Sequence, residues 1–222
     1  MAGVEGVEPT LAVLETDVLP LYDTPMCLFI LSYIACFWQD CQYNIRNMRY
    51  HFDTVKEKYY KSIALYRYEL IESGSKIDGL SQLEEYDDIE KWDFNLKLFE
   101  NEATLPPGYS VGFEYLYIDE NDEAVGMVNF RPFALKHPFL SKYGGHVGYN
   151  IKPSKRNLGI GNQMLKDFLP ICKEYGLDKI LITCMSYNEA SRKIIINNGG
   201  IFIDEIIYPP ENKTMQRYWI NL

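Results

Sequence analysis

The 222-residue sequence has few of the residues that usually hold metals, and no pattern that would bring them together. It contains three histidines and five cysteines, but no Cys-x-x-Cys pair and no histidine at metal-ligand spacing from a cysteine. An odd number of cysteines without a paired framework also argues against a disulfide scaffold. We therefore expect no metal site, reduced thiols and a cytoplasmic location.

Long apolar runs and basic residues are scarce in the first part of the chain. The most apolar segment, Met26–Trp38, has about 13 residues, fewer than the roughly 20 needed to cross a bilayer. No Lys or Arg precedes Arg46, so the basic start of a signal peptide is missing. A helix docked on the domain and a membrane-surface anchor remain alternatives for this segment. The net charge of −9 disfavours nucleic acid and anionic lipid, and we expect neither as a partner.

The chain is long enough for one ordinary α/β domain with a full core, and its hydrophobic content of 47% suits a globular protein. We expect this domain over residues 49–222. Residues 1–48 show no regular periodicity before Met26 and are expected to form a poorly ordered N-terminal extension. Alternatively, residues 3–25 resemble the translation of a transfer-RNA gene, which would make residues 1–48 a start-site artefact preceding a true start near Met48.

A strand, a glycine-containing loop and a helix follow one another from His146 onward. His146–Ile151 is apolar and aromatic, Arg156–Gly161 reads RNLGIG, and Asn162–Tyr175 has apolar residues at helical spacing. This arrangement presents free backbone N–H groups and a positive helix end to an anion. Glycines at 159 and 161 allow the backbone to approach a bulky diphosphate, and we expect the hydrogen side of Gly161 to face it. The loop is therefore predicted to be a pyrophosphate cradle.

Two common phosphate-binding motifs are excluded at this loop. A dinucleotide fingerprint would need a third glycine where Met164 stands, and a Walker loop would need Gly-Lys-Ser/Thr where Gly161-Asn162-Gln163 stands. A glycine-rich turn without a ligand is the remaining alternative.

The other elements can be placed by periodicity and turn residues. Thr54 and Glu57 have capping-box spacing and predict a helix that runs to Gly74, and a second helix is expected from Asp87 or Asp88. The remaining expected elements are strands at Ser110–Ile118, Ala124–Arg131, Lys179–Met185, Ile201–Ile207 and Met215–Ile220, a long loop at Pro132–Gly145 and a helix at Asn188–Asn198.

Several motifs in this order resemble one family. R-x-x-G-x-G after a strand that ends in I-x-P, followed by GLDKILITC, NEASRKIIINNGG and QRYWI, is similar to a bacterial subfamily of the GNAT superfamily of N-acetyltransferases over about residues 49–222. The resemblance implies an α/β fold with a mixed sheet and splayed parallel central strands, here His146–Ile151 and Lys179–Met185. It also implies acetyl-CoA as cosubstrate, no metal, and transfer of an acetyl group to a primary amine of a small molecule or peptide. Direct attack in a ternary complex is the implied mechanism, and a homodimer is compatible with it.

The resemblance also implies which residues bind the cofactor. The pantetheine arm would lie between the splayed strands and pair with the backbone of Tyr149, Asn150 and Ile151. Asn188 and Ser191 would contact this arm. Backbone N–H groups would hold the pyrophosphate at Arg156, Asn157, Leu158, Gly159, Ile160, Gly161 and Asn162.

The sequence departs from the family at the catalytic positions. Ile195 stands where many members place a tyrosine acid, and no carboxylate base lies on the first splayed strand. His146 is a candidate base, although a histidine that only forms hydrogen bonds is an equal alternative. Tyr149 and Tyr187 are candidate acids, and Cys184 lacks a histidine partner for acyl-enzyme chemistry.

These departures keep two other functions open. One is a catalytically weak or inactive CoA-binding module, and the other is an acyltransferase that uses a longer acyl chain. The acceptor cannot be read from the residues.

Overall fold

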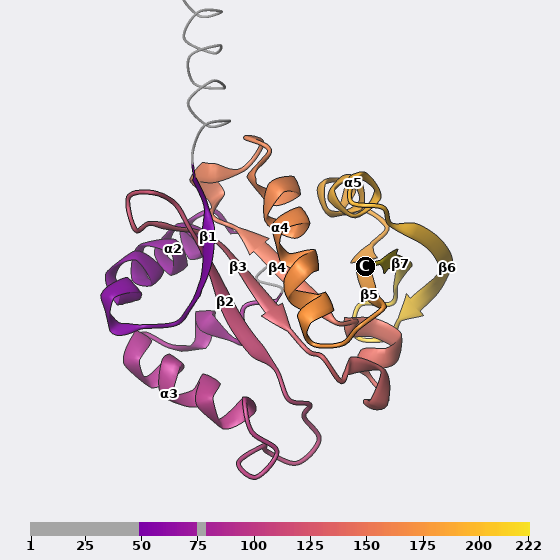
Figure 1. Ribbon diagram of the computed structural model, residues 1–222, viewed down its shortest axis with the longest axis horizontal. Helices are drawn as coiled ribbons and strands as arrows, with labels where there is room; N and C mark the ends of the chain where they lie inside the picture. The colour runs from indigo at the N-terminus through magenta and orange to yellow at the C-terminus, as the bar shows by residue number, and fades with distance from the viewer. Residues whose placement is uncertain (1–48, 75–78) are drawn as a thin grey trace, which may run out of the picture. The chain divides into compact units, whose positions relative to one another are not determined.

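Two antiparallel sheets form the framework of residues 49–74 and 79–222, which are the residues described by the computed structural model (Figure 1). They belong to one unit, Asn47–Leu222. The expectations for residues 1–48 lie outside the described residues. The first sheet has the order β1 (His51–Thr54), β2 (Phe113–Ile118), β3 (Ala124–Phe130), β4 (Val147–Ile151), and the second has the order β5 (Lys179–Met185), β7 (Lys213–Asn221), β6 (Ile201–Tyr208).

Helices cover both faces of the first sheet. Helices α2 (Tyr60–Glu72) and α3 (Ile89–Phe99) share a core with one face, whereas α4 (Ile160–Glu174) packs on the other face and reaches the second sheet (Figure 1). Helix α5 (Glu189–Asn197) follows β5. Short helical turns lie at Glu57–Tyr59, Leu83–Glu85, Ala134–Lys136, Leu140–Gly144 and Pro153–Lys155. Within the described ranges, none of the helices has the length and apolar character needed to cross a membrane.

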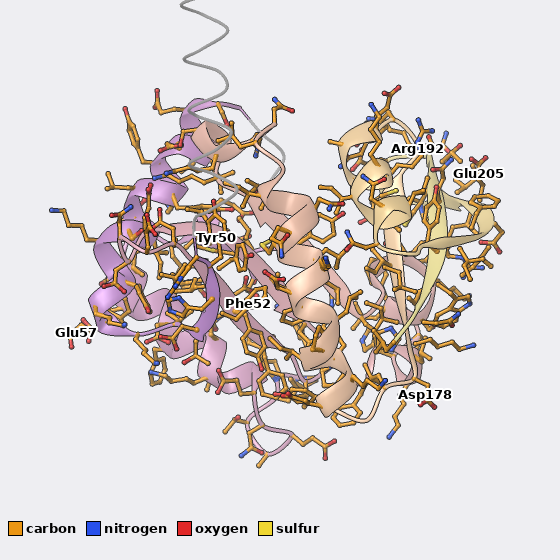
Figure 2. All side chains as sticks on the ribbon, turned by 45° about the horizontal axis from the view of Figure 1, so that its top comes forward. Tyr50, Phe52, Glu57, Asp178, Arg192 and Glu205 are labelled. Atoms are coloured by element: carbon orange, nitrogen blue, oxygen red, sulfur yellow. The ribbon has the colours of Figure 1, made fainter. Side chains whose placement is uncertain are left out.

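Strand β1 was not predicted, and it replaces the start of the predicted first helix. Thr54 ends β1 instead of capping a helix, and α2 begins at Tyr60 without a side-chain cap. The strand, which carries Phe52 (Figure 2), pairs with β2. The Phe52 ring lies 5.0 Å from the Phe168 ring of α4. Ladder pairing and aromatic burial thus outweigh the local capping signal.

The other predicted elements are close to those observed. Helix α3 begins after Asp88, whose side chain accepts a hydrogen bond from the N–H of Glu90. Helix α4 begins two residues earlier than predicted, and β5 has the predicted bounds. Strand β5 is largely buried as expected, but its ladder partner is β7.

Candidate functional site

The two sheets are joined at the start of β4. The backbone N–H of His146 donates to the Leu181 carbonyl at 2.8 Å, and the Leu181 N–H donates to Nδ1 of His146 at 2.8 Å. Beyond this junction β4 and β5 form no ladder in the described part of the chain. Strands β4 and β5 are therefore joined at His146 and Leu181 and are not paired beyond these two residues.

The edge of β4 that faces away from β3 carries backbone groups outside any ladder. The Arg131 N–H donates to the His146 carbonyl, and the Lys152 N–H donates to the Val125 carbonyl. The backbone N–H and C=O groups of the even-numbered residues of β4 therefore point towards β3. The N–H and C=O groups of Val147 and Tyr149 therefore point to the opposite edge. Those of Asn150 do not, which makes the predicted pairing of a cofactor with the Asn150 backbone wrong.

The N-terminal end of α4 presents a group of backbone donors. The N–H of Arg156 donates to the Pro153 carbonyl and that of Asn162 to the Gly159 carbonyl, so these two predicted donors are already used. The N–H groups of residues 157–161 donate to no backbone acceptor among the described residues. The first N–H groups of a helix lack intrahelical partners and lie at the positive end of its dipole. The predicted cradle thus narrows to these five residues.

The two loop glycines have different surroundings. A Cβ on Gly159, where φ is +83°, would have no neighbour within 4 Å. A Cβ on Gly161 would lie 2.8 Å from the Ile194 side chain and 3.3 Å from that of Ile151. The prediction that the hydrogen side of Gly161 faces a diphosphate is therefore wrong, since it faces the packed interior. Gly159 is the glycine whose open side faces away from the protein.

Other polar side chains of the predicted cradle brace the protein itself. Arg156 donates from Nε to the Ile151 carbonyl at 3.0 Å and from a terminal nitrogen to Asn150 Oδ1 at 3.4 Å. Tyr66 of α2 donates to the same Asn150 oxygen at 3.4 Å. The Asn162 Oδ1 accepts from Asn198 at 3.2 Å, which joins α4 to the end of α5. These contacts fix the loop and leave its backbone to meet a ligand.

An ion-pair network holds the turn between β4 and the cradle. Lys152 is 4% exposed, and its Nζ lies 2.6 Å from Glu123 and 3.1 Å from Glu69. Glu69 also accepts from the N–H of Ser154 at 3.0 Å. Burial alone would lower the pKa of Lys152, but the hydrogen bonds and charges of the two carboxylates outweigh it and hold this pKa above its usual value. This network was not predicted from the sequence, because its members lie far apart in the chain.

Tyr149 and the start of α5 meet across the site. The Tyr149 hydroxyl lies 2.9 Å from Ser191 Oγ, and the Asn188 side chain caps α5 by accepting from the Ser191 N–H at 3.1 Å. Burial raises the pKa of Tyr149 above its usual range, so the phenol is protonated at neutral pH. The structure brings together these three predicted residues. Tyr187 is half-exposed and lies beside Lys213.

His146 is unsuited to the predicted role of base. Its ring is 1% exposed, and Nδ1 accepts from a backbone N–H, so the neutral ring carries its proton on Nε2. Its only lone pair is therefore in use. Burial lowers the pKa of His146 to about 4, which keeps the ring neutral above that pH. The alternative of a hydrogen-bonding histidine matches this geometry.

The Cys184 thiol does not supply the site with a thiolate nucleophile. Burial raises the pKa of the Cys184 thiol to about 11, so it is not a thiolate at neutral pH. Within residues 49–74 and 79–222, no group of three or more His, Cys, Asp or Glu side chains is arranged to hold a metal ion.

The model of the acetyltransferase (GNAT) family matches residues 75–195. No curated protein sequence matches at a significant level.

Solved structures of low sequence identity share the fold. The structure of RimL, a ribosomal L7/L12 α-N-protein acetyltransferase in complex with coenzyme A, is 17% identical with a TM-score of 0.57, covering 78% of this chain and 94% of that one. Ribosomal-protein-S5-alanine acetyltransferase from Vibrio fischeri is 18% identical with a TM-score of 0.56, covering 78% and 92%. A chimera of spermidine N-acetyltransferase SpeG from Vibrio cholerae and hSSAT is 12% identical with a TM-score of 0.54, covering 78% and 94%. These likenesses confirm the expected fold.

Proposed function

Because this chain belongs to the GNAT family of acetyltransferases, we propose that it transfers the acetyl group of acetyl-CoA to a primary amine of a small molecule or peptide. The observation that carries the proposal is the group of backbone N–H donors of residues 157–161 at the start of α4. These donors suit the diphosphate of acetyl-CoA, and Gly159 leaves room for it.

The unpaired edge of β4 supports a position for the rest of the cosubstrate. The backbone groups of Val147 and Tyr149 would pair with the amides of the pantetheine arm, as a further strand would. A backbone N–H of this edge would then polarise the thioester carbonyl. Asn188 and Ser191, at the start of α5, would line the other side of the arm.

Transfer would occur by direct attack of the neutral amine on the thioester in a ternary complex. The protonated thiol of Cys184 argues against an acyl-enzyme. The protonated phenol of Tyr149 is the candidate acid for the leaving thiolate. The acceptors named for the structural neighbours are protein α-amines and spermidine, and these two classes define the first panel to test.

A pair of substitutions at Gly159 tests the cradle. Asn and Asp both tolerate a positive φ and both suit a helix N-cap, so the two variants should fold alike. Only Gly159→Asp places a negative charge against the diphosphate. We expect its Kd for acetyl-CoA, measured by calorimetry, to exceed that of Gly159→Asn at least tenfold, which is about 1.4 kcal/mol. Equal affinities of the two variants would refute the cradle.

A CoA-binding module without catalysis is the second candidate function, and the presence of Ile195 at the position of the family's tyrosine favours it. Both functions predict that acetyl-CoA stabilises the protein, by about 2.7 kcal/mol at a hundredfold excess over Kd. Only a transferase releases CoA when spermidine or an alanyl peptide is added. Stronger stabilisation by NAD or ATP than by acetyl-CoA would contradict both.

A further inference from the structure

A buried carboxylate lies on β2, on the sheet face that α2 and α3 cover. Glu114 is 5% exposed, and its neighbours on the same face of the strand, Leu116 and Ile118, belong to the core under α2 and α3. Its Oε2 accepts from Ser81 Oγ at 2.7 Å and from Asn129 Nδ2 at 3.1 Å. Its Oε1 is buried and has no hydrogen-bond partner. A buried carboxylate with one unused oxygen is costly to keep, so such an atom calls for an explanation.

The contact from Ser81 depends on an unusual backbone. Ser81 and Gln82 have backbone φ values of +47° and +60°, which residues other than glycine seldom adopt. The Ser81 carbonyl accepts from the indole N–H of Trp92 at 3.0 Å, which holds this conformation in place. Strained backbone of this kind gathers at functional sites.

Glu114 lies in a row that leads to the edge of β4. Glu114 is paired with Asn129 and Asn129 with Gly148, so the three residues cross β2, β3 and β4 side by side. Two strand spacings separate the first and last backbones by about 10 Å. A glutamate side chain and one hydrogen bond to an amine can bridge most of that distance. Gly79 and the Arg131 guanidinium lie against the Gly148 end of this row, and Ser81 lies against the Glu114 end.

We propose that Glu114 is the general base of the transfer reaction, and that its Oε1 accepts the proton which the acceptor's ammonium group must lose before it attacks. This inference rests on the proposed function. The N–H bond of the ammonium breaks, its electron pair stays on nitrogen, and Glu114 becomes a carboxylic acid. The neutral amine then forms the C–N bond and the C–S bond breaks. The leaving thiolate takes its proton from the Tyr149 phenol, which regains a proton from the attacking nitrogen. Glu114 returns its proton to solvent after release of the product.

The surroundings of Glu114 suit this step. Burial raises the pKa of Glu114 to about 8, against the lowering effects of its hydrogen bonds with Ser81 and Asn129 and of the Arg131 charge. Among the described residues, Arg131, which directly follows β3, and Tyr66 of α2 are the titratable groups that interact electrostatically with Glu114. A buried ammonium–carboxylate pair is poorly solvated, which favours transfer of the proton to give a neutral pair.

Steady-state turnover by Glu114→Gln tests the assignment. Glutamine keeps the shape and the Oε2 acceptor but cannot take a proton. With acetyl-CoA and the better of spermidine and an alanyl peptide, we expect kcat to fall about a hundredfold or more while the calorimetric Kd for acetyl-CoA stays within twofold. The acid limb near pH 8 in the wild-type kcat profile should disappear. Glu120→Gln, on the exposed hairpin turn, is the matched control and should keep both turnover and profile.

Ser81→Ala gives a second test, because it should change the pH profile of kcat only if Glu114 acts as the base. Loss of its hydrogen bond to the carboxylate should raise the pKa of Glu114 and shift the acid limb to higher pH. If Glu114→Gln turns over within twofold of wild type with an unchanged profile, the base assignment is wrong and the transferase proposal stands. If the wild-type protein neither binds acetyl-CoA nor releases CoA, the proposed function fails, and the assignment fails with it.

Discussion

His146 and Leu181 hold each other by two hydrogen bonds, each 2.8 Å long, one from each backbone N–H. One bond ends on a backbone carbonyl and the other on an imidazole nitrogen. The contact between the two sheets therefore depends on the protonation state of a side chain, since a protonated ring has no lone pair with which to accept.

This dependence predicts a loss of stability in acid. The pKa of His146 is lowered to about 4 in the folded protein, against about 6.5 in the unfolded chain. Between these values the unfolded chain binds more protons, so the stability present above pH 6.5 is lost as the pH falls towards 4, with a slope of up to about 1.4 kcal/mol per pH unit. His146→Gln should show a flatter profile in urea unfolding followed from pH 4 to 8. A profile as steep as that of wild type would show that other groups dominate.

Removal of the buried ammonium of Lys152 should weaken both the fold and the cradle. Lys152→Met leaves Glu69 and Glu123 without their shared cation, and we expect a cost of about 1–3 kcal/mol because both carboxylates keep some contact with water. The turn that Glu69 holds through Ser154 should loosen, which raises the Kd for acetyl-CoA. Urea unfolding and calorimetry measure the two effects.

Lys155→Met is the matched control, since Lys155 pairs with Glu123 at 2.8 Å but is more exposed. It should cost less than 1 kcal/mol. Equal losses in the two variants would contradict a special role for the buried lysine.

Two substitutions distinguish the contribution of the Tyr149 hydroxyl to turnover from the contribution of its hydrogen bond with Ser191. Tyr149→Phe removes the proton that the candidate acid would donate, whereas Ser191→Ala removes the partner at 2.9 Å and keeps the phenol. We expect kcat to fall at least tenfold in the first variant and less than threefold in the second, with KM for acetyl-CoA little changed in both. Similar losses in both would reduce Tyr149 to a structural residue.

Cys184 should be dispensable for chemistry. Cys184 is 6% exposed, and the raised pKa of its thiol, about 11, leaves almost no thiolate at neutral pH. Cys184→Ala should keep kcat within threefold of wild type, with a stability loss of about 1 kcal/mol from the buried methyl-sized gap. Abolished turnover in a folded Cys184→Ala protein would restore the acyl-enzyme mechanism.

The sequence predicted those parts of the molecule that local patterns determine. The β4–α4 segment and β5 were found from apolar periodicity and glycine spacing, and the family motifs lie on them. Strand β1 was missed because four residues with mixed exposure give no periodic signal, and its pairing with β2 joins segments about 60 residues apart.

Among the site residues, too, those set by local sequence were predicted and those set by distant residues were not. The backbone donors of the cradle follow from local geometry, but which glycine faces outward depends on Ile194, which lies on another helix. Glu114 was not among the predicted site residues. Leu116 and Ile118 on the same face of the strand already indicated that this face is buried, and a carboxylate beside them was the available signal.

The alternation of backbone groups along β4 gives each amide a different exposure to exchange with solvent. The amides of Gly148 and Asn150 are held by β3 whether or not a ligand is present, whereas those of Val147 and Tyr149 point away from β3 and join no ladder. Deuterium should therefore enter β4 at every second residue in the free protein. A molecule that takes the place of the missing strand would slow only those residues, so the exchange pattern of five consecutive amides would report occupancy of the gap without any measurement of turnover.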